Sequence, residues 1–151
     1  AAIPLVNEGE VLVIDAGGYT DVAVWGSIMT HAAMARGIAG LVIDGAVRDI
    51  AEIRELGFPC FARAHVPSGP HKGFGGIIDG PISCAGCPVK PGDLVIGDDD
   101  GVAVVPLEWA DDMLAASRDK LAQEEEMMKA IAEGRTTAEI LSIGEPEFIG
   151  P

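Results

Sequence analysis

The residues best suited to chemistry are an arginine and an aspartate in succession, Arg48 and Asp49, which follow a short apolar run. An arginine stays protonated and can bind an anionic group through paired hydrogen bonds, while a carboxylate is a ligand that Mg²⁺ and similar cations prefer. Together the two side chains can hold an anionic substrate and a divalent metal ion. The alternative is an ordinary exposed ion pair at the end of a strand, which contributes little to stability.

The segment from residue 25 to residue 49 must position this pair. Its apolar residues recur every three or four positions, which predicts a helix with one apolar face, formed by Ile28, Ala32, Ala35 and Ile38. Gly37 and Gly40 indicate a turn, and residues 41–43 are a short β-prone run. The Arg-Asp pair is therefore expected at the carboxyl end of a buried strand, where open α/β sheets commonly bind their ligands.

The rest of the chain predicts a mixed α/β domain. A strand is expected over residues 11–15, followed by a glycine-containing loop over residues 17–26 whose backbone amides can approach a ligand. A Gly- and Pro-rich loop over residues 65–76 carries His71 and Lys72. Further helices are expected over residues 50–56, 108–133 and 138–142, and further strands over residues 60–64, 77–78, 82–84, 94–96 and 102–105.

Composition narrows the function and the setting. The net charge of −14, from 24 acidic and 10 basic residues, argues against nucleic acid as a partner, because phosphate binding needs a basic face. Three cysteines, an odd number with one CxxC pair, predict reduced and buried thiols in a cytoplasmic protein rather than a metal or redox centre. No apolar run approaches the length of a membrane span and no basic signal segment is present, so no membrane partner is expected.

Several motifs occur in a characteristic order: WGSIMTHAAMARGIAGLVIDGAVRD, FARAHVPSGPHKG, ISCAG and VKPGDLVIGDDDGVAVVP, followed by an acidic helix. This set resembles the RraA-like family, which includes the divalent-metal aldolases of 4-hydroxy-4-methyl-2-oxoglutarate and 4-carboxy-4-hydroxy-2-oxoadipate. The resemblance covers nearly all of residues 11–134. It implies a single domain over residues 1–151 with a three-layer β/β/α, swivelling-domain-like fold. It also implies a homo-oligomer (trimer or hexamer) and a chain that lacks the N-terminal part of the family's domain.

The same resemblance implies roles for individual residues. Asp49 would bind the divalent metal, Mg²⁺ or Mn²⁺, and Arg48 would bind the substrate and stabilise an enolate. The backbone amides after the Gly26 turn, those of Ile28 and Met29, would hold the carboxylate of a pyruvyl group at a helix N-terminus.

Two more distant residues complete the site that the resemblance implies. Lys72 would be the catalytic lysine of the loop, and Glu124 the acid that the terminal helix of a neighbouring subunit supplies. Without the resemblance, Lys72 is an ordinary solvated lysine and Glu124 belongs to the solvated face of an acidic run.

One position departs from the aldolase pattern. The aldolases carry an acid that helps to handle the proton, and this chain has Ser27 there, which cannot act as a base near neutral pH. His31 lies one helical turn later on the same face and is a candidate proton carrier, because an imidazole titrates near neutral pH. The alternative is a histidine with no role beyond the helix surface.

Two functions from different classes therefore remain open. The first is a metal-dependent C–C lyase for a pyruvate-type 2-oxo acid, either an aldolase or an oxaloacetate decarboxylase, acting through a metal-stabilised pyruvate enolate. The second is a non-catalytic protein that binds and inhibits an RNA-processing enzyme, as the family's name-giving member does. The presence of Asp49 favours the lyase, because the resemblance implies that the regulators lack this acid, whereas Ser27 favours altered chemistry or none.

Overall fold

A computed structural model describes residues 2–71, 75–144, 147 and 150 of the chain. The chain divides into two compact units, Ala1–Leu107 and Glu108–Pro151. The prediction of one domain over the whole chain stays a prediction.

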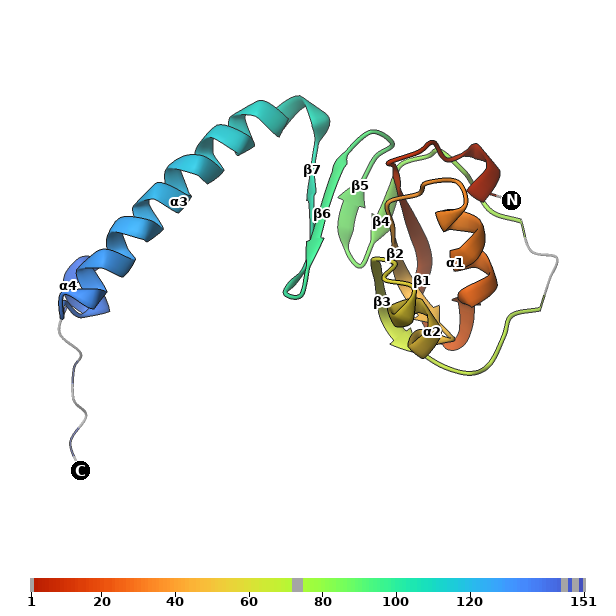
Figure 1. The fold of residues 1–151 in the computed structure, drawn as a ribbon, viewed down its shortest axis with the longest axis horizontal. Helices are drawn as coiled ribbons and strands as arrows, with labels where there is room; N and C mark the ends of the chain where they lie inside the picture. Colours follow the sequence, from red (N-terminus) through yellow and green to blue (C-terminus); the bar gives the residue numbers. More distant parts are fainter. Residues whose placement is uncertain (1, 72–74, 145–146, 148–149, 151) are drawn as a thin grey trace. The chain divides into compact units, whose positions relative to one another are not determined.

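The first unit is built on a parallel sheet of β1 (Val11–Trp25), β2 (Gly40–Val47) and β3 (Cys60–His65), in the order β1-β2-β3 (Figure 1). The crossovers contain α1 (Ser27–Met34) and α2 (Ile50–Glu55), and a 3₁₀ turn (Ile3–Leu5) precedes β1. Because both strand pairings are parallel, the carboxyl ends of all three strands lie at one edge of the sheet. The predicted βαβ arrangement and the strand before the Arg-Asp pair are confirmed.

Two antiparallel hairpins follow in the same unit: β4 (Ile82–Cys84) with β5 (Cys87–Val89), and β6 (Leu94–Asp98) with β7 (Gly101–Val105). Alternate residues of β2 face opposite sides of the sheet. Leu41 and Ile43 belong to the core that includes helix residues, whereas Val42 lines a cavity of about 220 Å³ together with residues of both hairpins. Helices and hairpins therefore pack on opposite faces of the parallel sheet.

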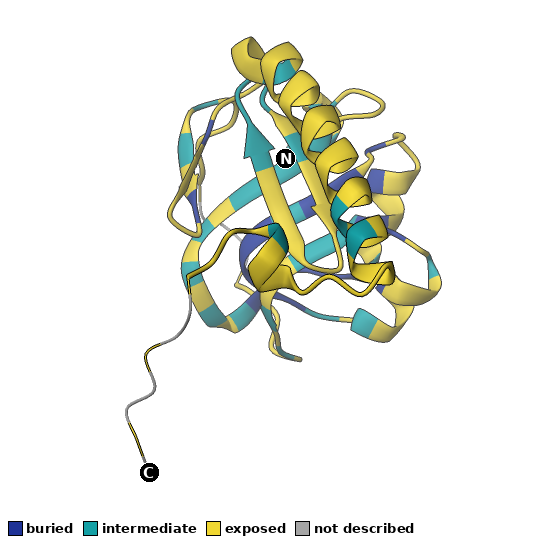
Figure 2. Ribbon diagram, turned by 90° about the vertical axis from the view of Figure 1, so that its left-hand side faces the viewer, coloured by how far each residue is buried: buried dark blue, intermediate teal, exposed yellow. Residues whose placement is uncertain are grey.

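Figure 2 shows the buried parts of the ribbon in dark blue. The core under the helices is aliphatic and aromatic, and it is formed by Trp25, Ala33, Ile38, Leu41, Ile43, Val47, Ile53 and Phe58. The predicted apolar face of α1 is wrong. Ile28, Ala32 and Ala35 are exposed, and the helix buries Thr30 and Ala33 instead. Thr30 can be buried because its hydroxyl has two hydrogen-bond partners. The Trp25 indole N–H donates to Thr30 Oγ1 (2.8 Å), and the Thr30 hydroxyl donates to the Gly26 carbonyl (3.2 Å).

Three further expectations differ from the structure. Residues 17–25 are the second half of β1, where an alternation of exposed and less exposed residues continues. The pairing of β1 with β2 shifts register three times, and the first shift, between Asp15 and Tyr19, contains Gly17 and Gly18. Residues 77–78 form no strand, and β5, which contains Pro88, was not predicted. Of the three free cysteines, Cys84 is buried but Cys87 is exposed at the start of β5.

The second unit is helical. It contains α3 (Ala110–Ala132), which follows a 3₁₀ turn (Leu107–Trp109), and α4 (Thr137–Ile140), which begins with a capping box between Thr136 and Glu139. No residue of α3 is buried, and most of its large apolar side chains are exposed, including Leu114, Leu121, Met128 and Ile131. Across the described residues, no helix is both long enough and apolar enough to cross a membrane.

Candidate functional site

The Arg-Asp pair lies directly after β2, at the carboxyl edge of the parallel sheet. The Arg48 N–H donates to the Trp25 carbonyl (2.9 Å), which ties the end of β2 to the end of β1. Asp49 then adopts a left-handed conformation, with φ of 60°, before α2 begins at Ile50. Aspartate tolerates this region better than most residues, and such strained positions cluster at functional sites. The sharp turn directs the carboxylate towards the start of α1.

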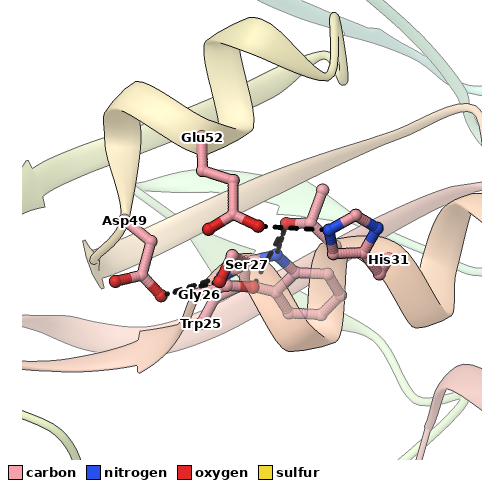
Figure 3. A network of polar contacts seen from close by, with 7 residues as sticks. Trp25, Gly26, Ser27, His31, Asp49 and Glu52 are labelled. Carbon is pink, nitrogen blue, oxygen red and sulfur yellow. Dashed lines mark hydrogen bonds and ion pairs between the residues drawn. The ribbon is translucent and has the colours of Figure 1, made fainter.

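The Asp49 carboxylate contacts its surroundings through one oxygen. Oδ2 accepts hydrogen bonds from the Ser27 backbone amide (3.0 Å) and the Ser27 hydroxyl (3.2 Å) (Figure 3). Arg48 Nε lies 3.6 Å from the same oxygen. The Ser27 amide is the main cause that lowers the pKa of Asp49, with smaller contributions from the Ser27 hydroxyl and Arg48. Among the described residues, none donates a hydrogen bond to Oδ1. The carboxylate therefore stays ionised and keeps one oxygen for a ligand.

Two glycines allow the close packing around this pair. A Cβ on Gly26 would lie 2.7 Å from Asp49 Oδ2 and 3.0 Å from Arg48 Cγ, and a Cβ on Gly69 would lie 2.8 Å from Arg48 Nη1. Gly26 was predicted as the turn before the helix. Gly69 was missed as a site residue, and its only signal was the Gly- and Pro-rich character of residues 65–76.

That predicted loop does reach the site. The Ala23 N–H donates to the Ser68 carbonyl (2.8 Å), and the Val66 N–H donates to the Val47 carbonyl (3.0 Å). These bonds hold the segment after β3 against the ends of β1 and β2, so that Gly69 lies beside the Arg48 guanidinium.

The first turn of α1 offers backbone donors next to the carboxylate. The Thr30 N–H bonds to the Gly26 carbonyl (3.1 Å), but in the described part of the chain no group accepts a hydrogen bond from the Ile28 or Met29 amide. Free amides at a helix N-terminus favour an anion. The predicted binding amides therefore lie beside the residue predicted to bind metal.

Two predicted site residues do not belong to the described part of this unit. Lys72 lies outside the described residues. Glu124 belongs to α3 in the second unit, where its Oε1 lies 3.8 Å from Lys120 Nζ. Within residues 2–71 and 75–144, no three His, Cys, Asp or Glu side chains gather as a metal cluster. Asp49 is a carboxylate at this edge that could hold a divalent ion together with oxygens from substrate and water.

Two polar pairs were not expected from the sequence. His31 Nε2 lies 3.1 Å from Glu52 Oε1, between α1 and α2. On the sheet, Arg63 Nε donates to Asp44 Oδ1, and the Ala85 amide donates to Asp44 Oδ2 (2.9 Å). The Arg63 hydrogen bond is the main cause that lowers the pKa of Asp44. Neither pair could be found by spacing, because 21 and 19 residues separate the partners.

A parallel sheet with a basic residue and a carboxylate after its middle strand is the arrangement of an α/β protein that binds ligands at a sheet edge. A family model described as RraA-like (Aldolase/RraA) matches residues 1–104, and the chain therefore belongs to the RraA-like family. The predicted family is confirmed.

Two similar proteins carry the name of an aldolase, one of them as a candidate. The chain is 42% identical over 127 residues (84% of the chain and 60% of the relative) to a candidate 4-hydroxy-4-methyl-2-oxoglutarate aldolase of Halalkalibacterium halodurans. It is 37% identical over 98 residues (65% of the chain and 60% of the relative) to the 4-hydroxy-4-methyl-2-oxoglutarate aldolase of Thermus thermophilus. The chain thus spans 60% of the length of both relatives.

A solved structure from the RraA inhibitor family is similar to this chain. RraAS2 of Streptomyces coelicolor, described as an unusual member of the RNase ES inhibitor RraA protein family, superposes with a TM-score of 0.78 at 32% identity. The match covers 85% of this chain and 66% of that one. The mixed α/β fold with a parallel sheet is therefore that of RraA-like proteins.

Proposed function

We propose that the protein is a divalent-metal-dependent C–C lyase for a pyruvate-type 2-oxo acid, cleaving 4-hydroxy-4-methyl-2-oxoglutarate, decarboxylating oxaloacetate, or both. The observation that carries the proposal is the Asp49 carboxylate, which has one oxygen held by Ser27 and the other open, beside the Arg48 guanidinium. The names of the two aldolase relatives support the same class of reaction.

The chain's own groups would bind and orient the substrate. The free amides of Ile28 and Met29 would hold the carboxylate of the pyruvyl group, where the helix N-terminus favours negative charge. Arg48, which packs against the backbone at Gly69, would lie at the 2-oxo oxygen and stabilise the negative charge that develops there. A fixed cation needs no reorganisation during the reaction, which is why it lowers the barrier more than solvent can.

The donor chemistry of the site fits Mg²⁺ or Mn²⁺. Mg²⁺ takes one or two carboxylates and otherwise keeps water or substrate oxygens, and Asp49 Oδ1 is an open, ionised oxygen of this kind. When bound, the ion supplies Lewis-acid stabilisation of the enolate oxygen. The two donors of Ser27 hold Oδ2, so the orientation of the carboxylate is set by the protein.

We also propose that the working protein is a homo-oligomer, a trimer or hexamer, with the complete β/β/α swivelling-domain fold. The exposed apolar side chains of α3 support this, because such a stripe usually packs against another surface. Glu124 on the same helix would then reach a neighbouring site, and Lys72 would complete it from the loop. The three free cysteines are consistent with a cytoplasmic setting.

The test is pyruvate release from oxaloacetate and from 4-hydroxy-4-methyl-2-oxoglutarate, with Mg²⁺ or with a chelator. The wild type should release pyruvate only with the metal, and Asp49→Ala should lose about 10²-fold or more of the rate. Asp93→Ala is the matched control, because Asp93 also accepts a backbone hydrogen bond (from Lys90 N, 2.8 Å) but precedes β6 in the chain and is no partner of Asp49 or Arg48. If neither substrate gave pyruvate in a metal-dependent way, the proposal would be wrong.

Ser27 favours a second candidate, a non-catalytic regulator that binds and inhibits an RNA-processing enzyme. The Ser27 hydroxyl donates to Asp49 and is not a base near neutral pH. The structural similarity to RraAS2 fits this alternative. Inhibition of a ribonuclease by the wild type and Asp49→Ala alike, with no pyruvate formed by either, would favour it over the lyase.

A further inference from the structure

The two cysteines of the CxxC sequence lie directly opposite each other in the β4–β5 hairpin. Cys84 ends β4, Cys87 begins β5, and the two residues are partners in the antiparallel register. Ala85 and Gly86 connect them with φ of 52° and 84°, the positive values of a two-residue hairpin turn. Opposite residues of such a pair have Cα atoms about 4.5–5.5 Å apart and side chains on one face, and a disulfide spans about 4.4–6.8 Å between Cα atoms. The register therefore brings two thiols to a spacing that a disulfide can bridge.

The two thiols differ in their access to solvent. Cys84 is buried and its thiol donates to the Ile14 carbonyl (3.8 Å), whereas Cys87 is exposed. Both residues line the cavity of about 220 Å³ beside the parallel sheet. The turn between them faces open space, since a Cβ on Gly86 would meet nothing within 4 Å. A small reagent in solution therefore reaches Cys87 first, and Cys84 is its partner across the hairpin.

Other roles explain the pair less well. Zinc takes four ligands in a structural site, and no three His, Cys, Asp or Glu side chains gather within residues 2–71 and 75–144. Packing accounts for the buried Cys84 but not for Cys87 at the surface. A bridge across a two-residue turn closes so short a loop that it constrains the unfolded chain little, so it is a poor structural disulfide. An accessible thiol beside a second thiol is instead the arrangement of cysteines that undergo reversible oxidation.

We propose that Cys84 and Cys87 form a thiol-exchange site for small soluble disulfides of the glutathione type, with Cys87 as the attacking thiol and Cys84 as the resolving thiol. The inference does not depend on the proposed lyase function. In the first step the Cys87 thiolate attacks one sulfur of the small disulfide, breaks its S–S bond, forms a mixed disulfide and releases one thiol. In the second step the Cys84 thiolate attacks the Cys87 sulfur, forms the Cys84–Cys87 bond and releases the second thiol.

The two steps balance. The hydrogens of the two protein thiols end on the two released thiols, so the protein is oxidised by two electrons and the small disulfide is reduced by two. Burial sets the order of the steps, because it keeps a bulky disulfide away from the Cys84 sulfur. It is also the main cause that raises the pKa of the Cys84 thiol, which leaves little thiolate there near neutral pH. The Ala85 amide donates to Asp44 Oδ2 (2.9 Å) and so holds the turn on the sheet while the two sulfurs approach.

The experiment exposes the folded full chain to mixtures of reduced and oxidised glutathione, followed by an alkylating quench, intact-mass measurement and peptide mapping. The wild type should lose two of its three free thiols and the mass of two hydrogen atoms, with the new bond between Cys84 and Cys87, and a reducing agent should restore both thiols. Cys84→Ser should stop at the mixed disulfide, with glutathione attached to Cys87. Cys87→Ser should react at Cys84 about tenfold or more slower than the wild type reacts at Cys87, because burial protects that thiol.

Two control variants test the geometry. Cys60→Ala removes the third thiol, which is half-buried in β3, and should leave the reaction unchanged. The double variant Ser83→Cys with Cys84→Ser keeps the number of thiols, but residue 83 pairs with Pro88 and faces the other side of the hairpin. It should form the glutathione adduct on Cys87 without closing a disulfide. Circular dichroism before and after oxidation verifies that each sample stays folded.

Three results for the wild type would overturn the proposal. These are a stable glutathione adduct on Cys87, no product at all, and a disulfide that closes only in the chain unfolded by urea. A double variant that closes a disulfide as readily as the wild type would also overturn it, since the opposite placement of the two cysteines in the hairpin would then be irrelevant.

Discussion

Asp44 and Asp49 lie five positions apart on one segment, have nearly the same kinds of partner, and yet differ in what they can bind. Each carboxylate accepts a hydrogen bond from a backbone amide, and each lies beside an arginine side chain. Both oxygens of Asp44 accept hydrogen bonds from the protein, Oδ1 from Arg63 Nε and Oδ2 from the Ala85 amide. It lies within β2, its side chain is 8% exposed, and it ties β3 and the β4–β5 turn to the sheet.

Asp49 lies two residues after the end of β2 at Val47. Its donors gather on Oδ2, its side chain is 38% exposed, and Oδ1 has no donor among the described residues. The comparison teaches that an aspartate next to an arginine is not in itself a site. The distribution of donors over the two oxygens, and the position relative to the strand end, separate a structural carboxylate from one that can bind a ligand.

The largest expected effect comes from exchanging each carboxylate for its amide. Asp49→Asn should lose about 10²-fold or more of metal-dependent activity, with a small change in melting temperature, because an exposed amide oxygen still accepts the Ser27 N–H. Asp44→Asn should lower the melting temperature clearly, because Arg63 loses its ionised partner, while the activity of the folded protein stays near wild type. Mn²⁺ titration by EPR and thermal unfolding measure the two effects. If both variants lost activity and melting temperature alike, Asp44 and Asp49 would not differ in role.

A smaller effect tests whether Asp49 depends on the close approach of α1. In Gly26→Ala the new Cβ would lie 2.7 Å from Asp49 Oδ2, so the carboxylate or the first turn of α1 must shift. Activity should fall by about 10–10²-fold, because misplacement of a catalytic group by 1 Å has effects of that size. The comparison variant is Gly75→Ala, whose Cβ would meet nothing within 4 Å. Equal activity of the two variants would show that the site does not need this packing.

Much of the scaffold was predictable because it depends on local patterns. The β-prone run of residues 41–43, the helix after Asp49 and its end at Gly57 follow from short-range preferences, and β2 and α2 form there. The Arg-Asp pair was therefore placed at the correct strand end. The continuation of β1 beyond Gly17 and Gly18 was missed, because these glycines alone favour a loop, whereas the parallel pairing of β1 with β2 resumes at Tyr19.

The rest of the site depends on contacts between distant segments. Thr30 is buried because Trp25 donates to it, which no helical period reveals. The His31–Glu52 pair and the packing of Gly69 on Arg48 require the crossovers to be folded first. Glu124 and Lys72 remain predictions, one from the second unit and one outside the described residues.

The smallest expected effect is the dependence of stability on pH, and it separates the two aspartates by their response to metal. Both have a folded-state pKa below the ordinary value of 3.8. Such a group stabilises the fold above its unfolded-state pKa, and the contribution disappears as the pH falls through the lower folded-state pKa. Stability should therefore decline from about pH 5 downwards, and each Asp→Asn variant should flatten that decline.

Mg²⁺ should distinguish the two contributions. A cation that binds ionised Asp49 favours the folded state and competes with protons, so it should shift the acid transition of wild type and Asp44→Asn to lower pH. It should leave Asp49→Asn unchanged, because the amide binds the ion poorly. Circular dichroism at a series of pH values, with and without Mg²⁺, measures the shift. A Mg²⁺-induced shift that persists in Asp49→Asn but vanishes in Asp44→Asn would contradict the assignment of the metal to Asp49. The ligand-binding carboxylate would then be the one inside the sheet rather than the one at its edge.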